Sequence, residues 1–168
     1  KKGYFHNTIF VFVGDHGIAG NAKAVYPDVW TDQRLSHEHV PLLFYAPALL
    51  TPQQRTEVVS QIDVLPTVAG LANQHYQNTT LGRDLLDPSK KTNAAFIIYH
   101  DEEQVGWVTD SFYYTRNLRF PEEALYPLNS NHSPWSREEE KRLKAESSAM
   151  VSAFYETAKW MLVNNKKH

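Results

Sequence analysis

The sequence predicts an α/β protein with a partial parallel sheet that is flanked by helices and joined by a small antiparallel meander. Two apolar runs, at residues 8–13 and 40–46, predict adjacent strands buried on both faces, because neither run alternates with polar residues. Apolar residues at helical spacing predict helices that begin at Ser60 and Ser136. Three short β-branched and aromatic runs between residues 94 and 116 predict the meander.

Length and composition predict one folded unit. A chain of 168 residues, 42% of them hydrophobic, is long enough to bury one sizeable core and too short for two comfortable domains. The net charge of -2 argues against a nucleic-acid partner, and the lack of cysteine excludes disulfides, thiolate metal sites and a cysteine nucleophile. No apolar stretch approaches the roughly 20 residues of a spanning helix, so an export signal or membrane anchor is expected outside this chain.

The segment between the two apolar runs is predicted to be a long loop. Residues 17–38 are polar and glycine-dotted, are interrupted by Pro27 and show no helical period. Loops of that length in compact domains are usually functional or mobile. The second run fits a strand because Pro41 stands near its first position and Pro47 ends it.

Both predicted helices begin with a capping-box pattern. Ser60 with Asp63 precedes an apolar spacing that continues to residue 73, with a bend expected at Pro66, so Asp63 is given a structural role rather than a catalytic one. Ser136 with Glu139 precedes the second helix. Its core stripe is predicted to consist of Leu143, Met150, Phe154, Ala158 and Met161.

Three polar segments are predicted to lie on the surface. Residues 78–88 and 121–134 are rich in turn-forming residues and read as irregular. Residues 100–103 (HDEE) carry metal-ligating atom types, but they fall between two short strands and are interpreted as a solvated hairpin loop. The charge run at residues 137–144 is interpreted as the solvated first turns of the last helix.

The carboxyl end of the first apolar run carries the strongest candidate site. Asp15 and His16 stand there between Gly14 and Gly17. A carboxylate beside an imidazole suits a hard or borderline divalent cation. The two side chains can share one ion only if the backbone turns, and the glycines permit that turn. An Asx-type turn followed by a surface histidine is the alternative interpretation.

Four segments together resemble sulfatase-type members of the alkaline phosphatase superfamily, in the family's order and spacing. They are residues 7–17 (NTIFVFVGDHG), 39–47 (HVPLLFYAP), 61–68 (QIDVLPTV) and 81–86 (LGRDLL). The glycine before Asp15 and the HVPL strand are most similar to the lipoteichoic acid synthase-like phosphoglycerol transferases. The resemblance implies an alkaline phosphatase-like sheet and identifies residues 1–168 as the C-terminal portion of a sulfatase-like catalytic domain.

The resemblance also implies a metal-dependent transferase or hydrolase. Its substrates would be phosphate or sulfate esters of glycans or lipid head groups, at the periplasmic or extracellular face of a membrane. The implied cofactor is a divalent cation, manganese or zinc in the transferases and calcium in the sulfatases, held partly by Asp15 and His16. No nucleophile of the family is matched, so no catalytic residue is assigned. The chain is expected to be inactive without the N-terminal half of the same domain.

Three further residues are candidates for substrate binding. Family members often carry a lysine in the loop after Asp-His and a histidine before the Pro-Leu strand, and Lys23 and His39 match these positions. Lys23 would act as a point charge on a substrate oxyanion, and His39 as a donor or as a ligand to a second ion. His37 can substitute for His39. The alternatives are a solvated lysine and a strand-edge histidine bonded to backbone.

A second functional class is a non-catalytic domain that keeps the fold. It would use the loop at residues 17–38 and an aromatic rim to bind a glycan or a protein. Uncovered sheet edges would also invite pairing into a homodimer.

Overall fold

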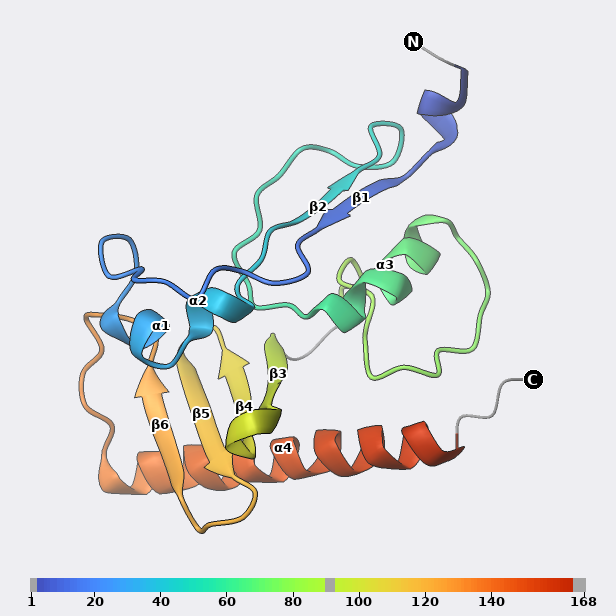
Figure 1. The fold of residues 1–168 in the computed structure, drawn as a ribbon. Coiled ribbons are helices and arrows are strands. Elements are labelled where there is room, and N and C mark those ends of the chain that lie inside the picture. Colours follow the sequence, from blue (N-terminus) through green and yellow to red (C-terminus); the bar gives the residue numbers. More distant parts are fainter. Residues whose placement is uncertain (1–2, 90–92, 165–168) are drawn as a thin grey trace. The chain divides into compact units, whose positions relative to one another are not determined.

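The computed structural model describes residues 3–89 and 93–164 (Figure 1). The chain forms two compact units rather than the one that its length predicts. The N-terminal unit comprises Lys1–Glu57 and Gln61–Lys91, and the C-terminal unit comprises Val58–Ser60 and Thr92–His168. No helix among the described residues is long and apolar enough to cross a membrane.

The N-terminal unit contains a two-stranded antiparallel sheet of β1 (Phe10–Val13) and β2 (Leu42–Tyr45). The two strands are adjacent, as predicted, with Phe10 opposite Tyr45, but the predicted parallel direction is wrong. Parallel pairing requires a long crossover that usually contains a full helix. The connection here holds only α1 (Asp28–Asp32) and α2 (Leu35–Glu38), which are each about one turn long.

The expectation that both strands are buried on both faces is also wrong within this chain. The side chains of Phe12 and Leu43 are 58% and 54% exposed. The faces of a sheet are buried only where other elements pack on them. Apolar side chains of this two-stranded sheet therefore stay exposed where no other element of the chain covers them. The short helices α1 and α2 also correct the prediction that residues 17–38 contain no helix.

The N-terminal unit also contains two 3-10 helices and one further α-helix. The 3-10 helix η1 (Gly3–Asn7) precedes β1, and the 3-10 helix η2 (Gln61–Asp63) leads directly into α3 (Val64–Leu71). The structural role of Asp63 is confirmed. The carboxylate makes no capping hydrogen bond to α3. It is buried and accepts a hydrogen bond of 2.9 Å from the backbone N–H of Arg83.

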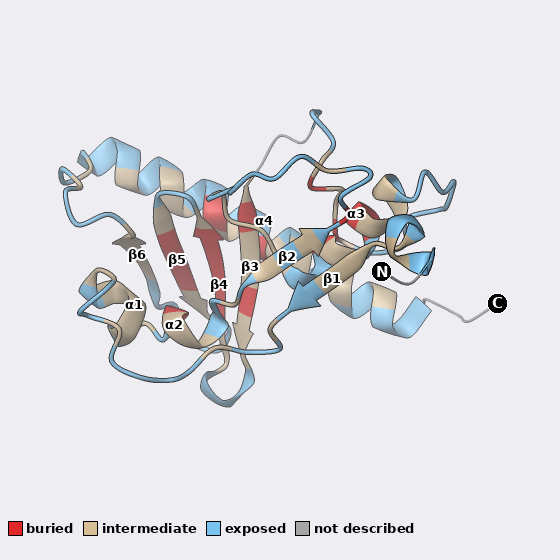
Figure 2. Cartoon of the chain, turned by 90° about the horizontal axis from the view of Figure 1, so that it is seen from above, coloured by how far each residue is buried: buried red, intermediate tan, exposed pale blue. Residues whose placement is uncertain are grey.

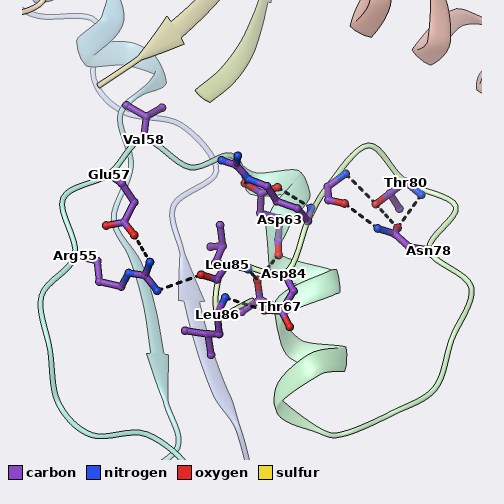
Figure 3. A network of polar contacts seen from close by, with 12 residues as sticks. Arg55, Glu57, Val58, Asp63, Thr67, Asn78, Thr80, Asp84, Leu85 and Leu86 are labelled. Carbon is purple, nitrogen blue, oxygen red and sulfur yellow. Dashed lines mark hydrogen bonds and ion pairs between the residues drawn. The ribbon is translucent and has the colours of Figure 1, made fainter. Parts of the chain in front are cut away.

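A polar network ties α3 to residues 78–88, which are irregular as predicted (Figure 3). The hydroxyl of Thr67 donates to the backbone oxygen of Asp63 and accepts from the N–H of Leu85, at 2.7 and 3.0 Å. The guanidinium of Arg55 donates to the Leu85 carbonyl at 3.1 Å and pairs with Glu57. A Cβ at Gly82 would collide with the carbonyl oxygen of Ile62, so only glycine fits there.

The C-terminal unit contains a four-stranded antiparallel sheet in the order β3-β4-β5-β6. Its strands are β3 (Ala94–Tyr99), β4 (Gln104–Thr109), β5 (Phe112–Asn117) and β6 (Glu123–Pro127). The predicted meander is confirmed, and the exposed 3-10 helix η3 (His100–Glu102) forms the predicted hairpin loop. The fourth strand corrects the expectation that residues 121–134 are irregular. Asn117 builds the turn before it, because its side-chain oxygen accepts the N–H groups of residues 119 and 120.

Helix α4 (Arg137–Asn164) packs on this sheet, and its first turns are mostly solvated, as predicted. The predicted cap is confirmed, because the Ser136 hydroxyl accepts the N–H of Glu139 at 3.1 Å. The predicted core stripe is wrong at Met150, which is exposed. The buried positions are Ser147 and Val151, so the buried face of α4 includes the residue that follows Met150 rather than Met150 itself. Serines hid this face from a search for apolar residues.

The apolar core of the C-terminal unit lies between β3, β4, β5 and α4. Figure 2 shows buried residues concentrated on β4 and β5. The core cluster consists of Ala94, Val105, Trp107, Tyr114 and Val151. The ring of Phe154 packs against Trp107 at 5.0 Å between centroids and extends this core along α4.

Candidate functional site

The candidate site in the N-terminal unit begins at the turn that follows β1. The N–H of Gly14 donates to the Pro41 carbonyl at 3.2 Å, and the N–H of Gly17 donates to the His37 carbonyl at 2.6 Å. A Cβ at Gly17 would collide with the backbone oxygen of Ser36. The turn after β1 is therefore held directly against the segment that leads into β2, which brings two loops distant in sequence together.

Asp15 and His16 lie side by side on this turn. Asp15 Oδ2 and His16 Nε2 are 3.8 Å apart, and both side chains are largely exposed. Asp15 Oδ1 accepts the backbone N–H of His16 at 2.9 Å, and this bond lowers the pKa of Asp15, with the nearby imidazole adding to the effect. The predicted turn is present and the two groups converge rather than diverge.

The His16 ring is oriented by its own backbone. Its Nδ1 lies 2.8 Å from the carbonyl oxygen of Gly17. Since a carbonyl oxygen can only accept, this contact assigns the proton to Nδ1 and leaves Nε2 facing Asp15. The same hydrogen bond, followed by the charge of Asp15, raises the pKa of His16.

His37 joins this pair, whereas His39 does not. The rings of His16 and His37 are stacked with centroids 5.5 Å apart, and Nδ1 of His37 lies 3.1 Å from a carboxylate oxygen of Glu38. His39 instead packs edge-on against Tyr26 and Trp30, at 5.7 and 5.1 Å between ring centroids. The sequence assigned Trp30 no role. No helical spacing signalled this contact, because Tyr26 lies before α1 and not within it.

Lys23 is engaged by two carboxylates. Its Nζ lies 2.8 Å from Asp32 and 3.6 Å from Asp28. The hydrogen bond with Asp32 raises the pKa of Lys23 and keeps it protonated. The structure thus places Lys23 in an ion-pair cluster on the loop, and its role toward a substrate oxyanion stays a prediction.

The donor set at Asp15 and His16 fits part of a metal site. A ligating histidine usually donates its second ring N–H to a backbone carbonyl or a carboxylate, which is the arrangement of His16 with Gly17. Two ligands about 2.1 Å from a tetrahedral cation lie roughly 3.4 Å from each other, close to the observed 3.8 Å. Within residues 3–89 and 93–164, no three His, Asp or Glu side chains are grouped to hold a metal ion. The pair therefore offers two ligands.

Comparisons with known proteins find a partial similarity to one family and a shared fold. The family model described as Sulfatase matches residues 1–74. An arylsulfatase from Clostridium perfringens is 26% identical over 129 residues, which cover 71% of this chain and 26% of that protein. The family-model match at residues 1–74 includes the turn after β1 and the strand β2.

Two solved structures resemble the chain over most of its length. A protein in the alkaline phosphatase superfamily from Vibrio parahaemolyticus gives a TM-score of 0.60 at 22% identity, covering 92% of this chain and 36% of that one. A protein solved in complex with its substrate D-glucosamine-2-N,6-O-disulfate gives 0.59 at 16% identity, covering 94% and 36%.

The chain therefore spans about a quarter of the curated relative and about a third of each solved chain. The predicted fold class is confirmed as α/β, with antiparallel sheets in place of the parallel one. The chain shares the fold of alkaline phosphatase superfamily proteins, and residues 1–74 are similar to the sulfatases.

Proposed function

We propose that this chain is part of a metal-dependent enzyme that acts on sulfate or phosphate esters, and that it supplies two metal ligands, Asp15 and His16. The observation that carries the proposal is the geometry of this pair. His16 Nδ1 is committed to the Gly17 carbonyl, and Nε2 faces Asp15 Oδ2 at 3.8 Å on a turn fixed by two backbone hydrogen bonds. The similarity of residues 1–74 to sulfatases supports this assignment.

Manganese, zinc or calcium is the expected cation. When bound, it would polarise an ester oxygen and lower the pKa of a hydroxyl nucleophile. Asp15, whose pKa is lowered, is ionised and ready to bind a cation. His16 presents Nε2 once its raised pKa has been exceeded. The exposed pair lies open to further ligands from outside the described residues.

The remaining parts of the site are assigned to other segments of a longer domain. The solved chains with this fold are about two and a half times as long, which supports an additional N-terminal half that brings the nucleophile and the other ligands. His37, stacked on His16, is the best placed of the three substrate-binding candidates. His39 and Lys23 lie farther along the loop in contacts of their own, and each is assigned a secondary role toward the anionic group.

The proposed setting is the periplasmic or extracellular face of a membrane, with an anchor in a segment outside this chain. The substrate is assigned to the anionic esters of glycans or lipid head groups. The exposed faces of β1 and β2 suit coverage by the additional half of the domain, and a homodimer is the alternative cover.

Hydrolysis by the full-length protein tests the proposal. Aryl sulfate and aryl phosphate are offered separately, with manganese, zinc or calcium, so that sulfatase and phosphate-ester chemistry are distinguished. Asp15→Ala is expected to abolish turnover. Asp101→Ala is the matched control, because Asp101 is an exposed carboxylate on the hairpin loop of the C-terminal unit. Full activity of Asp15→Ala would remove the site from consideration.

A phosphoglycerol transferase is the finer assignment that the sequence resemblance favours. It would require the phosphate arm to be active and a glycerol-containing lipid to serve as donor. The sulfatase names among the comparisons favour the sulfate arm instead. Activity toward aryl sulfate alone would decide against the transferase.

A non-catalytic glycan-binding domain is the second candidate, and the aromatic cluster of Tyr26, Trp30 and His39 favours it. The rings of Tyr26 and Trp30 are stacked at 4.7 Å, and aromatic faces of this kind also bind sugar rings. In this case Trp30→Ala would weaken glycan binding while Asp15→Ala would leave it unchanged. The enzyme proposal requires instead that Asp15→Ala lowers turnover more than Trp30→Ala does.

A further inference from the structure

The C-terminal unit carries a surface pocket that the proposed reaction does not use. Its volume of about 550 Å³ lies within the range of small-molecule sites, roughly 300–1,000 Å³. The pocket is formed by the first turns of α4 and the start of β6, two elements that contact each other. Its charged and hydroxyl lining consists of Glu123, Arg137, Glu140, Lys141, Lys144 and Ser148.

Helical spacing directs one subset of the charge run into this pocket. Arg137, Lys141, Lys144 and Ser148 follow one another at steps of four, three and four residues, so they share one face of α4. Arg142 belongs to the same charge run but does not line the pocket, and it pairs with Glu146 at 3.0 Å. The run at residues 137–144 is thus divided between a pocket face and an outer face.

The two carboxylates of the pocket are already engaged. Glu140 pairs with Lys144 at 2.7 Å. Glu123 accepts a hydrogen bond of 2.8 Å from the phenol of Tyr114, which is fully buried. Burial, together with this carboxylate, raises the pKa of Tyr114 to about 12, so the phenol keeps its proton and the bond persists at physiological pH.

Two cations of the pocket are left for a ligand. Arg137 and Lys141 form no ion pair with any carboxylate in the part of the chain that the structure describes. A guanidinium binds oxyanions through two parallel N–H bonds, and an ammonium adds a compact point charge. The carboxylate oxygens of Glu123 and Glu140 that remain free can accept hydrogen bonds from hydroxyl groups. The lining therefore combines sites for an anion with sites for hydroxyls.

We propose that this pocket binds an anionic sugar, with Arg137 and Lys141 holding a sulfate or carboxylate group and the lining carboxylates accepting its hydroxyls. A bare inorganic anion would use the cations but would meet the two carboxylates unfavourably. A neutral sugar would use the acceptors and leave both cations unpaired. The binding does not require the reaction proposed at Asp15 and His16, so each proposal can fail without the other.

Backbone amide NMR of the chain locates the site. The probes are D-glucosamine-2-N,6-O-disulfate, glucuronate, neutral N-acetylglucosamine and inorganic sulfate, each titrated separately. The two anionic sugars are expected to shift the amide signals of Glu123 and of residues 137–148, and to separate sulfate from carboxylate preference. Inorganic sulfate is expected to bind about tenfold more weakly than the preferred sugar. Equal binding of inorganic sulfate would reduce the site to a general anion patch and overturn the proposal.

Two charge-matched double variants test the named cations. Arg137→Gln with Lys141→Gln is expected to raise the dissociation constant of the preferred sugar about tenfold or more. Arg142→Gln with Lys159→Gln removes the same charge from exposed positions of the same helix, and a change below about twofold is expected. Equal losses in both variants, shifts confined to other residues, or no shifts with either anionic sugar would each overturn the proposal. Circular dichroism checks that α4 is intact in both.

Discussion

The two units of the chain are stabilised by different means. In the C-terminal unit, large apolar side chains such as Val105, Trp107 and Val151 are buried between a sheet and a long helix. In the N-terminal unit, the fully buried side chains include Thr67, and a polar network joins α3 to an irregular segment. Apolar side chains on β1 and β2 stay exposed there.

This difference separates the stable core from the candidate chemistry. Asp15 and His16 lie on a loop, and His37 on the short helix α2, of the unit that buries fewer apolar side chains. Backbone hydrogen bonds rather than packing hold these segments together. Segments with few buried apolar contacts open at lower free-energy cost than a packed core. The following variants test whether the two units differ in this way.

The largest effect is expected from Trp107→Ala in the C-terminal unit. Trp107 is 5% exposed and contacts Phe154, so its removal leaves a cavity that should lower the free energy of unfolding by about 3–5 kcal/mol. Hydrogen exchange of the β4 and β5 amides measures the loss. Trp160→Ala, at a tryptophan that is 63% exposed, is the control and should cost less than about 0.5 kcal/mol. Similar losses at both tryptophans would contradict the assigned core.

A smaller loss is expected from Thr67→Val in the N-terminal unit. Valine keeps the volume of threonine but leaves the buried N–H of Leu85 without its acceptor, at a cost of about 1–3 kcal/mol. Faster hydrogen exchange at Leu85 is the specific readout. Thr56→Val, at an exposed threonine of the same unit, is the control. An unchanged exchange rate at Leu85 would show that the network does not stabilise this unit.

The binding of zinc at Asp15 and His16 is expected to depend on pH. A proton and a metal compete for His16, and its raised pKa makes the proton the stronger competitor. Zinc affinity should rise up to about tenfold per pH unit below that pKa, and it should still rise above 6.5, the ordinary value for histidine. Zinc titrations followed by the backbone amide signals of residues 14–17 in NMR, between about pH 5.5 and pH 8, measure this affinity. His16→Ala should remove the dependence, and His100→Ala should preserve it.

The smallest effect on stability is expected from Lys23→Gln. The ion pairs of Lys23 with Asp28 and Asp32 are solvent-exposed, so their loss should lower the melting temperature only slightly, and less at high salt. Thermal unfolding measures the cost, with Lys159→Gln as a control that breaks another exposed pair. If Lys23→Gln lowers aryl sulfate turnover by the full-length protein without this loss of stability, the lysine acts on the substrate.

Much of the fold followed from local patterns. The apolar runs predicted β1 and β2, the alternation of strand and turn predicted the meander, and Ser136 predicted the start of α4. The antiparallel direction of β2 could not be predicted from its sequence. An apolar run indicates which faces of a strand are buried, but it does not indicate whether the strand runs parallel or antiparallel to its neighbour. Val151 was missed because its face of α4 is shared with serines.

Part of the candidate site could also be predicted from local sequence patterns. The glycines at positions 14 and 17 predicted a turn, and this turn brings Asp15 and His16 together. The separate environment of His39 could not be predicted, because its contacts with Tyr26 and Trp30 depend on the tertiary path of the loop.

The crowding around Gly17 has a consequence for how damage at this site should be interpreted. The side chain of any larger residue there would push the turn after β1 away from residues 36–39, since the carbonyl oxygens of Ser36, His37 and His39 already surround the position. Such a variant would retain each donor atom in the sequence yet force His16 and His37 apart. For the proposed reaction, a larger residue at position 17 would therefore be as damaging as the loss of either histidine, because it changes only the spacing of the two rings.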